Sequence, residues 1–152
     1  METTAARIRW FVDTNVLVYA TDARSPFHHM ARDMLKSARD KGVELCVNAQ
    51  VIREYISAAS RSVGESKPIP WSTILENCSR FQQMFTVLSE GQETVSRLRE
   101  LLNTVPAAGK QVHDANIVAT MLVYGVSVLL THNAADFARY ARFIDLLSAC
   151  AV

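Results

Sequence analysis

The chain has 152 residues, which is enough for one domain with a full hydrophobic core. Hydrophobic residues make up 49% of the chain and charged residues 20%, which excludes a disordered protein. The formal net charge of +1 argues against a protein that binds nucleic acid mainly through a high net positive charge. We therefore expect a single domain over residues 1–152, with residues 1–7 as a flexible N-terminal extension.

The predicted elements alternate between strands and helices. In chain order we expect strand 8–13, helix 15–21, helix 25–41, strand 44–47, helix 48–60, helix 70–85, strand 86–89, helix 92–105, helix 111–124, strand 127–131 and strand 142–147. Ser25 and Pro26 offer an N-cap and a first helical position, and Asn48 offers a second N-cap. Gly42 and Gly125 end the helices before them. This order predicts an α/β fold with a central parallel sheet of about five strands, flanked by helices, in a strand order that the sequence does not specify.

Nothing in the sequence indicates export or a membrane. The longest apolar runs, such as 126–130, are far shorter than the ~20 residues that cross a bilayer, and the N-terminus lacks an apolar signal core. Cys46, Cys78 and Cys150 lack the spacing of a zinc site, and their odd number argues against a disulfide framework. We expect three reduced thiols in a cytoplasmic protein without a membrane partner.

Several polar residues lie where an α/β sheet has its active crevice, outside the carboxyl ends of the strands. Asp13 ends the first strand, and Glu54 lies in the helix after the second strand. Asn133 and Asp136 lie in the loop that leaves strand 127–131. Their positions predict that these side chains meet at one edge of the sheet.

Asp114 is the most informative acid, because it lies on a helix that is apolar nearly all round. A lone buried carboxylate costs several kcal/mol unless it is paired or binds a cation. Asp114 could instead complement the dipole of its helix, and Asp13 could cap the helix that follows it. Glu54 could form a surface ion pair with Arg61 or Lys67.

Carboxylates that meet at one point repel each other, and a hard divalent cation relieves that repulsion. Carboxylate and amide oxygens favour Mg²⁺ or Mn²⁺, whereas zinc prefers His or Cys. Such an ion binds a phosphate oxygen and lowers the pKa of an attacking water. The sequence has no glycine-rich phosphate loop, so the site fits phosphodiester hydrolysis better than the use of a nucleoside triphosphate.

Four segments of the sequence resemble the PIN-domain family, and within it they look most like the VapC-type toxins of bacterial type II toxin–antitoxin systems. They are FVDTNVLVYA at 11–20, REY around Glu54, HDANIVATMLVYGVSVLLTHNAADF at 113–137 and the closing FIDLL. The likeness extends from about residue 8 to 147, and the 65–110 region carries no family motif. The resemblance implies a PIN-like fold and a Mg²⁺- or Mn²⁺-dependent endoribonuclease that cuts single-stranded RNA.

Position by position, the resemblance assigns Asp13, Glu54 and Asp114 as catalytic residues and metal ligands. Asp13 and Asp114 would hold the metal, and Glu54 would orient the water, accept its proton or help to hold the metal. The fourth site position of the family is often Asp and is Asn133 here, so Asp136 is a further catalytic candidate that could supply the missing charge. Three polar residues are expected to support the site by orienting its acids: Asn15, Thr131 and Asn133.

The resemblance also implies partners. Proteins of this type dimerise, and a small antitoxin inhibits them by covering the site, where we expect it to contact helices 25–41 and 48–60. Arg and Lys residues outside the acidic pocket would hold the RNA backbone. If the four acids share one pocket, the rest of the molecule carries 16 positive against 11 negative charges, or +5, which suits RNA.

Two other classes of phosphate-handling protein with a similar sheet fit the same residues poorly. A haloacid-dehalogenase-like enzyme needs a second acid two residues after its nucleophile, where this sequence has Asn15. A response-regulator receiver needs a phosphorylated mid-chain Asp with a downstream Lys, and neither is well placed here. Two alternatives stay open: a PIN-like module that binds RNA or protein without catalysis, and a PIN nuclease of RNA processing outside a toxin pair.

Overall fold

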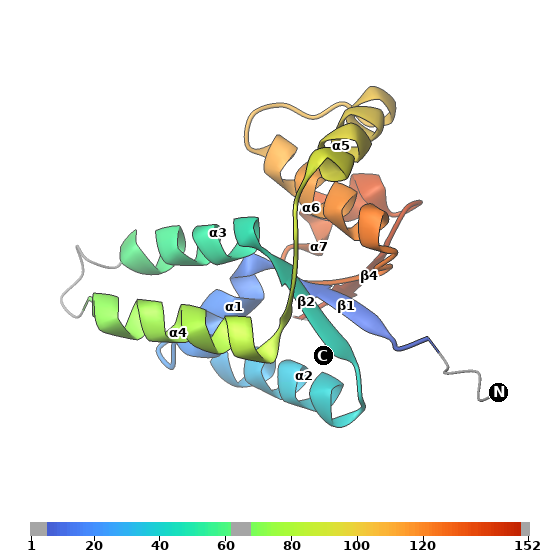
Figure 1. Ribbon diagram of the computed structural model, residues 1–152. Helices are drawn as coiled ribbons and strands as arrows, with labels where there is room; N and C mark the ends of the chain where they lie inside the picture. The colour runs from blue at the N-terminus through green and yellow to red at the C-terminus, as the bar shows by residue number, and fades with distance from the viewer. Residues whose placement is uncertain (1–5, 62–67, 150–152) are drawn as a thin grey trace.

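The structure is a computed structural model that describes residues 6–61 and 68–149 (Figure 1). The described residues form the strands β1 (Arg9–Val12), β2 (Glu44–Asn48), β3 (Thr86–Leu88), β4 (Val128–Thr131) and β5 (Asp145–Ser148). They also form the helices α1 (Thr14–Thr21), α2 (His28–Asp40), α3 (Ala49–Ser60), α4 (Trp71–Met84), α5 (Gln92–Thr104), α6 (Gln111–Tyr124) and α7 (Ala134–Phe137), and the 3₁₀ turn η2 (Ala138–Tyr140). Of the expected extension 1–7, residues 1–5 lie outside the described residues.

The described strands all run parallel in the order β3-β2-β1-β4-β5, which confirms the predicted α/β class. The chain starts at the central strand, builds outward through β2 and β3, and then crosses to the other side of β1 for β4 and β5. The strand order therefore reverses its direction at the neighbouring strands β1 and β4. Their register pairs Phe11 with Leu129 and Val12 with Leu130. Such a reversal leaves a crevice outside the carboxyl ends of the two strands.

The strands on either side of this reversal are deeply buried. Phe11, Val12, Leu129 and Leu130 are inaccessible to solvent, as expected for a parallel sheet covered on both faces. Figure 1 shows α3 beside α4 on the left and α5 on α6 at the top, and both pairs are in contact. The middle of α6 is buried, as its apolar sequence predicts. None of the described helices is long and apolar enough to cross a membrane.

Several helix ends follow their local signals. Asn48 caps α3, because its side-chain oxygen accepts a hydrogen bond from the backbone N–H of Val51 at 3.0 Å. Gly125 ends α6 in the left-handed conformation, with φ at 67°, which a residue with a Cβ atom adopts only under strain. Gly42 has the same conformation after α2, with φ at 80°. These three predictions are confirmed.

The predicted start of the helix over 25–41 is wrong. α2 begins at His28, so Ser25 is not its N-cap and Pro26 is not its first residue. The Ser25 hydroxyl instead accepts a hydrogen bond from the backbone N–H of Phe27 at 3.1 Å, and the Ser25 carbonyl accepts one from that of His28 at 3.2 Å. Ser25 therefore closes a turn before the helix, which is the other local structure that serine favours.

Two predictions near the C-terminus also differ from the structure. The strand predicted over 142–147 begins at Asp145, because the Tyr140 carbonyl accepts hydrogen bonds from the N–H groups of Phe143 and Ile144 at 2.8 and 3.2 Å. These bonds hold the segment before β5 in a turn. The loop predicted after β4 contains the short helix α7. An apolar run indicates that a strand is near, but it does not locate the first residue of that strand.

The described cysteines are buried free thiols, Cys46 and Cys78. Burial, together with the negative charge of Glu44, raises the pKa of Cys46 to about 11, so this thiol stays protonated near neutral pH. Cys150 lies outside the described residues.

Candidate active site

Asp13 occupies the crevice where β1 and β4 end. It caps α1, because its Oδ1 accepts a hydrogen bond from the backbone N–H of Thr14 at 2.8 Å, and its Oδ2 accepts one from the Thr131 hydroxyl at 2.8 Å. Only 7% of Asp13 is exposed, and this burial raises the pKa of its carboxyl. The two hydrogen bonds oppose the rise, and the negative charges of Glu54 and Asp136 add to it. The helix cap and the candidate site residue are the same carboxylate.

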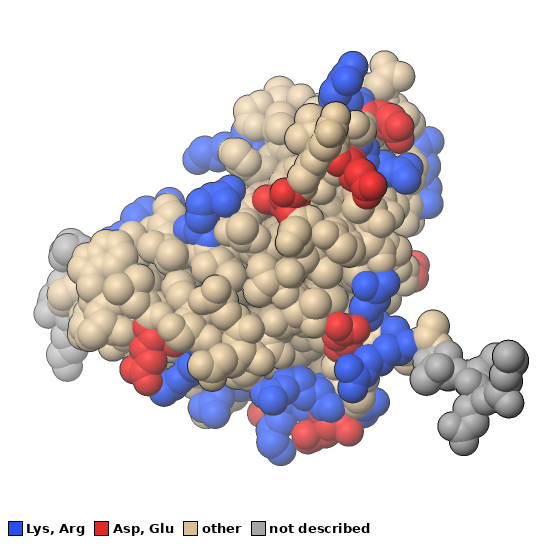
Figure 2. Space-filling view, viewed as in Figure 1, with Lys and Arg blue, Asp and Glu red and all other residues tan. Residues whose placement is uncertain are grey.

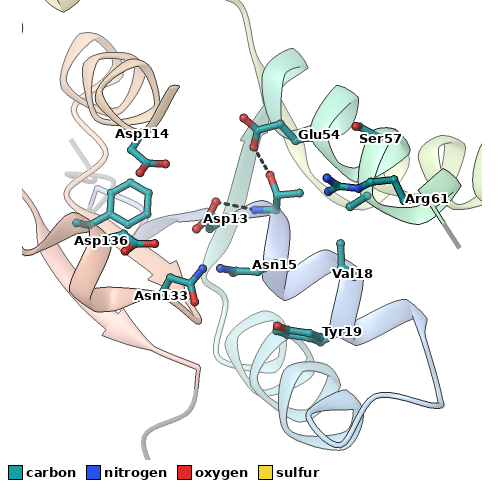
Figure 3. Close-up of a pocket in the computed structure, with 13 residues that line it drawn as sticks. Asp13, Asn15, Val18, Tyr19, Glu54, Ser57, Arg61, Asp114, Asn133 and Asp136 are labelled. Atoms are coloured by element: carbon teal, nitrogen blue, oxygen red, sulfur yellow. Dashed lines mark hydrogen bonds between the residues drawn. The ribbon is translucent and has the colours of Figure 1, made fainter. Parts of the chain in front are cut away.

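Glu54 reaches the same crevice from α3 (Figure 3). Its Oε2 accepts a hydrogen bond from the Thr14 hydroxyl at 2.7 Å, and its Oε1 accepts one from the side-chain amide of Gln50 at 2.8 Å. Among the described residues no ion pair joins Glu54 to Arg61, and Lys67 lies outside them. Glu54 is therefore held by neutral donors inside the crevice, and its pairing with Arg61, one of the two surface alternatives, is not formed.

Asp114 enters the crevice from the first turn of α6, where an acid also complements the helix dipole. Its side chain is half-buried and forms no ion pair with another described residue. Burial raises the pKa of Asp114 to about 6, with further contributions from the negative charges of Asp13, Asp136 and Glu54, while the positive charge of Arg139 opposes the rise. The neighbouring carboxylates make this more than a dipole-complementing acid.

All four predicted acids line one pocket of about 420 Å³. Figure 3 shows Asp114 and Asp136 on one side of Asp13, with Glu54 on the other side. Asp136 lies in the first turn of α7 and is exposed. Asn133, at the N-cap position of α7, lines the pocket as well and makes no side-chain cap bond. The structure therefore brings both candidates for the fourth position to the same pocket.

Of the three predicted supporting residues, Thr131 contacts Asp13 directly, whereas Asn15 bonds to the backbone of His132 and Asn133 bonds to Thr131 through its backbone. Thr131 is fully buried, and its hydroxyl donates to Asp13 and accepts a hydrogen bond from the backbone N–H of Asn133 at 3.0 Å. The side-chain oxygen of Asn15 accepts a hydrogen bond from the backbone N–H of His132 at 3.1 Å. These bonds tie the start of α1 to the end of β4.

Sequence reasoning missed two residues that hold the acids, Thr14 and Gln50. The backbone N–H of Thr14 binds Asp13 while its hydroxyl binds Glu54, so one residue joins two acids. Gln50 binds Glu54 and also the backbone carbonyl of His113 at 2.9 Å. The spacing of Gln50 four residues before Glu54 on one helix could have indicated their contact. No local pattern reveals the bond between Thr14 and Glu54, which lie 40 residues apart.

The sequence profile of the PIN domain matches residues 10–143. The chain belongs to the PIN-domain family. It is similar to ribonuclease VapC7 of Mycobacterium tuberculosis, with 27% identity over 121 residues that cover 79% of each chain. Among solved structures, VapBC-1 from nontypeable Haemophilus influenzae matches with a TM-score of 0.69 and 16% identity, over 95% of this chain and 100% of that chain. A toxin–antitoxin complex from Klebsiella pneumoniae matches with a TM-score of 0.65 and 17% identity, over 93% and 98%.

The acidic pocket of this PIN domain has donors that suit a hard divalent cation. They are carboxylate and amide oxygens, and the described residues supply no Lys or Arg ion pair to neutralise the acids. As placed, no three described His, Cys, Asp or Glu side chains form a group that could hold one ion. Because Mg²⁺ keeps several waters, one or two protein carboxylates are enough for it. The pocket therefore fits such an ion, and the three-ligand set of Asp13, Glu54 and Asp114 stays a prediction.

A second hollow of about 580 Å³ continues from the acidic pocket of the PIN domain and has a basic rim. It shares Glu54, Asp114 and Asp136 with the first pocket. Its basic side chains, which form no ion pair with a described acid, are Arg61, Lys110 and Arg139. On the face that Figure 2 shows, Lys and Arg lie in separate groups, with the largest along α2.

Proposed function

We propose that this PIN domain is a divalent-metal-dependent endoribonuclease and the toxin of a type II toxin–antitoxin pair. The observation that carries the proposal is the meeting of four acids in one pocket at the reversal between β1 and β4. Family membership and the similarity to a mycobacterial ribonuclease support the reaction. The shared fold with a toxin–antitoxin complex is consistent with the toxin role.

The proposed roles of the acids follow from their surroundings. Asp13 and Asp114 would hold Mg²⁺ or Mn²⁺, because a cation relieves the burial and crowding of negative charge that raise the pKa of each. Nucleases of this family are metal-dependent in general, and the bound ion polarises the scissile phosphate and makes the attacking water more acidic. Glu54, held at both oxygens, would orient that water and accept its proton, or help to hold the ion. Asp136 adds negative charge at the exposed rim.

The basic rim beside the acids would hold the RNA backbone. Arg61, Lys110 and Arg139 are exposed and line the hollow that continues from the acidic pocket. Contacts from such side chains to phosphates fix the register of the RNA without reading its bases. We therefore expect RNA binding to weaken as salt concentration rises.

The proposed antitoxin would contact α2 and α3. A groove of about 580 Å³ runs along α2 and is lined by apolar side chains that include Trp10, Met30, Met34 and Leu147, which suits an apolar segment of a partner. α3 carries Glu54, so a chain laid across it would cover the acidic pocket.

We also propose a homodimer. Trp71 and Leu75 lie one turn apart on α4, and each is 54% exposed. Large apolar side chains exposed side by side are typical of a surface that another protein covers. Measurement of the molecular mass in solution tests this part of the proposal, and a monomer at all concentrations contradicts it.

The test of the function is cleavage of a single-stranded RNA with Mg²⁺, with Mn²⁺ and with a chelator. We expect cleavage by the wild type only with a divalent ion, and none by Asp13→Asn or Asp114→Asn. The matched control is Asp145→Asn, because Asp145 is an exposed acid at the amino end of β5, away from the crevice. Cleavage that survives both site substitutions, or that needs no ion, contradicts the mechanism.

Two outcomes favour the alternatives. If the wild type binds RNA but does not cut it, the chain is a binding module of the PIN fold. If it cuts RNA but no short antitoxin reading frame lies beside its gene, a nuclease of RNA processing is the better interpretation.

A further inference from the structure

We infer that Gln50 is a positioning residue that sets Glu54 and Asp114 at their places on the two sides of the pocket, an inference that rests on the ribonuclease function proposed above. Gln50 lies in the first turn of α3 and is only 3% exposed. Its Nε2 donates to Glu54 Oε1 at 2.8 Å and to the backbone carbonyl of His113 at 2.9 Å. His113 directly precedes Asp114, so a single amide group spans the two helices that carry these acids.

The surroundings of Gln50 determine the orientation of its amide. Its Oε1 accepts a hydrogen bond from Asn116 Nδ2 at 2.7 Å, while its Nε2 faces two acceptors. In the reversed orientation the amide oxygen would face two other acceptors, the Glu54 carboxylate and the His113 carbonyl. The amide nitrogen would then face another donor, Asn116 Nδ2. Only one orientation therefore satisfies the buried group, and in it both N–H bonds are used.

The partner of Gln50 is itself held in place. Asn116 also donates to Glu90, which accepts a second hydrogen bond from Asn48 at 3.2 Å. Asn48 is the N-cap of α3 and also donates to Thr120 on α6 at 3.3 Å. These bonds form a closed ring from α3 to α6 and back, so a shift of one helix against the other breaks at least one of them.

The position of Gln50 makes it more than a packing residue. Of the two acceptors of its Nε2, one is an acid of the pocket and the other is the residue before a second acid. Loss of such an outer hydrogen bond typically costs 10–100-fold in metal affinity or activity. A displacement of about 1 Å at a reacting group has an effect of similar size.

The test compares Gln50→Met with Val51→Ala. Methionine keeps the length and burial of the side chain but has no donor, so we expect kcat for RNA cleavage with Mn²⁺ to fall by about 10–100-fold while KM for RNA is unchanged. Val51 is the next residue of α3 and is fully buried, so its truncation destabilises the same helix through packing alone. We expect Val51→Ala to keep the wild-type kcat. An equal kcat for the two variants overturns the inference.

A second readout separates this inference from the proposed function. Calorimetric titration with Mn²⁺ is expected to give a dissociation constant about 10–100-fold higher for Gln50→Met than for the wild type and for Val51→Ala. If the wild type cuts no RNA, the proposed function fails, and the titration still tests Gln50. Equal Mn²⁺ affinities for the two variants then overturn the inference.

A measurement on the wild type applies if Gln50→Met does not fold. Both side-chain amide protons of Gln50 are hydrogen-bonded and buried, so we expect them to exchange with solvent far more slowly than those of the exposed Gln82. Exchange at the same rate as for Gln82 overturns the inference.

Discussion

Asp13 and Asp136 line the same pocket, but the protein holds them in opposite ways. Asp13 is buried at the ends of two central strands, where Thr14 and Thr131 each donate a hydrogen bond to it. Asp136 is exposed on a four-residue helix, and its carboxylate has no hydrogen bond or ion pair with another described residue. The site therefore has a fixed centre and a looser rim.

This difference indicates where the chemistry depends most on the fold. A group that is held before the substrate arrives needs no reorganisation when charge develops, so its contribution is large. A group in contact with water is screened and adds little. We expect substitutions to lose less activity the further they lie from Asp13 toward the rim.

The largest effect is expected for Asp13→Asn. Cleavage should fall by more than about 100-fold, which is the upper range for the loss of an outer-shell partner. The melting temperature should not fall, because asparagine also caps α1 and the substitution removes a buried charge. Single-turnover cleavage and thermal unfolding check the two parts. Loss of activity together with a lower melting temperature would mean that Asp13 serves the fold and not the reaction.

The next effect is expected for Thr131→Val, which removes the hydroxyl between Asp13 and the backbone of Asn133. We expect a fall of about 10–100-fold in cleavage and a loss of about 1–3 kcal/mol in the free energy of unfolding, because a buried carboxylate loses a donor. Urea unfolding and cleavage kinetics measure both. The control is Thr104→Val on the exposed side of α5, which should change stability by less than about 0.5 kcal/mol.

A smaller effect is expected at the rim. Asp136→Asn should lower cleavage by less than about tenfold, because an exposed charge acts through water. The same single-turnover assay compares it with Asp13→Asn. If the two substitutions lower the rate of cleavage by the same factor, the distinction between centre and rim is wrong, and Asp136 fills the fourth position of the site.

The last prediction concerns the dependence of stability on pH. The pKa of Asp114 is about 6 in the folded protein and about 3.9 in an unfolded chain, so the folded state binds more protons between these values. Without divalent ions, the free energy of unfolding should therefore fall as pH rises from about 4 to about 6, and the loss should be complete above that. Urea unfolding across this range should show a shallower fall for Asp114→Asn. If the free energy of unfolding of Asp114→Asn falls as steeply as that of the wild type, or more steeply, the acids do not crowd Asp114.

Features that depend on short stretches of the chain could be predicted from the sequence. Asp13 follows an apolar run, Asp114 lies in an apolar helix, and Asn48 and Gly125 end elements through their own conformational preferences. The N-cap at Ser25 was wrong because serine closes a turn as readily as it caps a helix, and the two signals are the same.

Features that depend on distant partners could not be predicted in the same way. The strand order follows from the packing of β4 beside β1, and no local pattern specifies that pairing. The contacts of Thr14 and Gln50 likewise need α1, α3 and α6 to be in place first. The motif order of the family located the acids and Thr131, but not Thr14 or Gln50, which hold Glu54.

The hydrogen bond between Thr131 and Asp13 joins residues that lie 118 positions apart. A growing polypeptide therefore carries Asp13 long before it carries Thr131, and it lacks one side of the crevice until β4 has been added. At about 5–20 residues per second, the interval is on the order of ten seconds. Throughout that time the nascent chain has no finished centre, so a ribosome that makes this protein is not exposed to its chemistry until the domain is nearly complete.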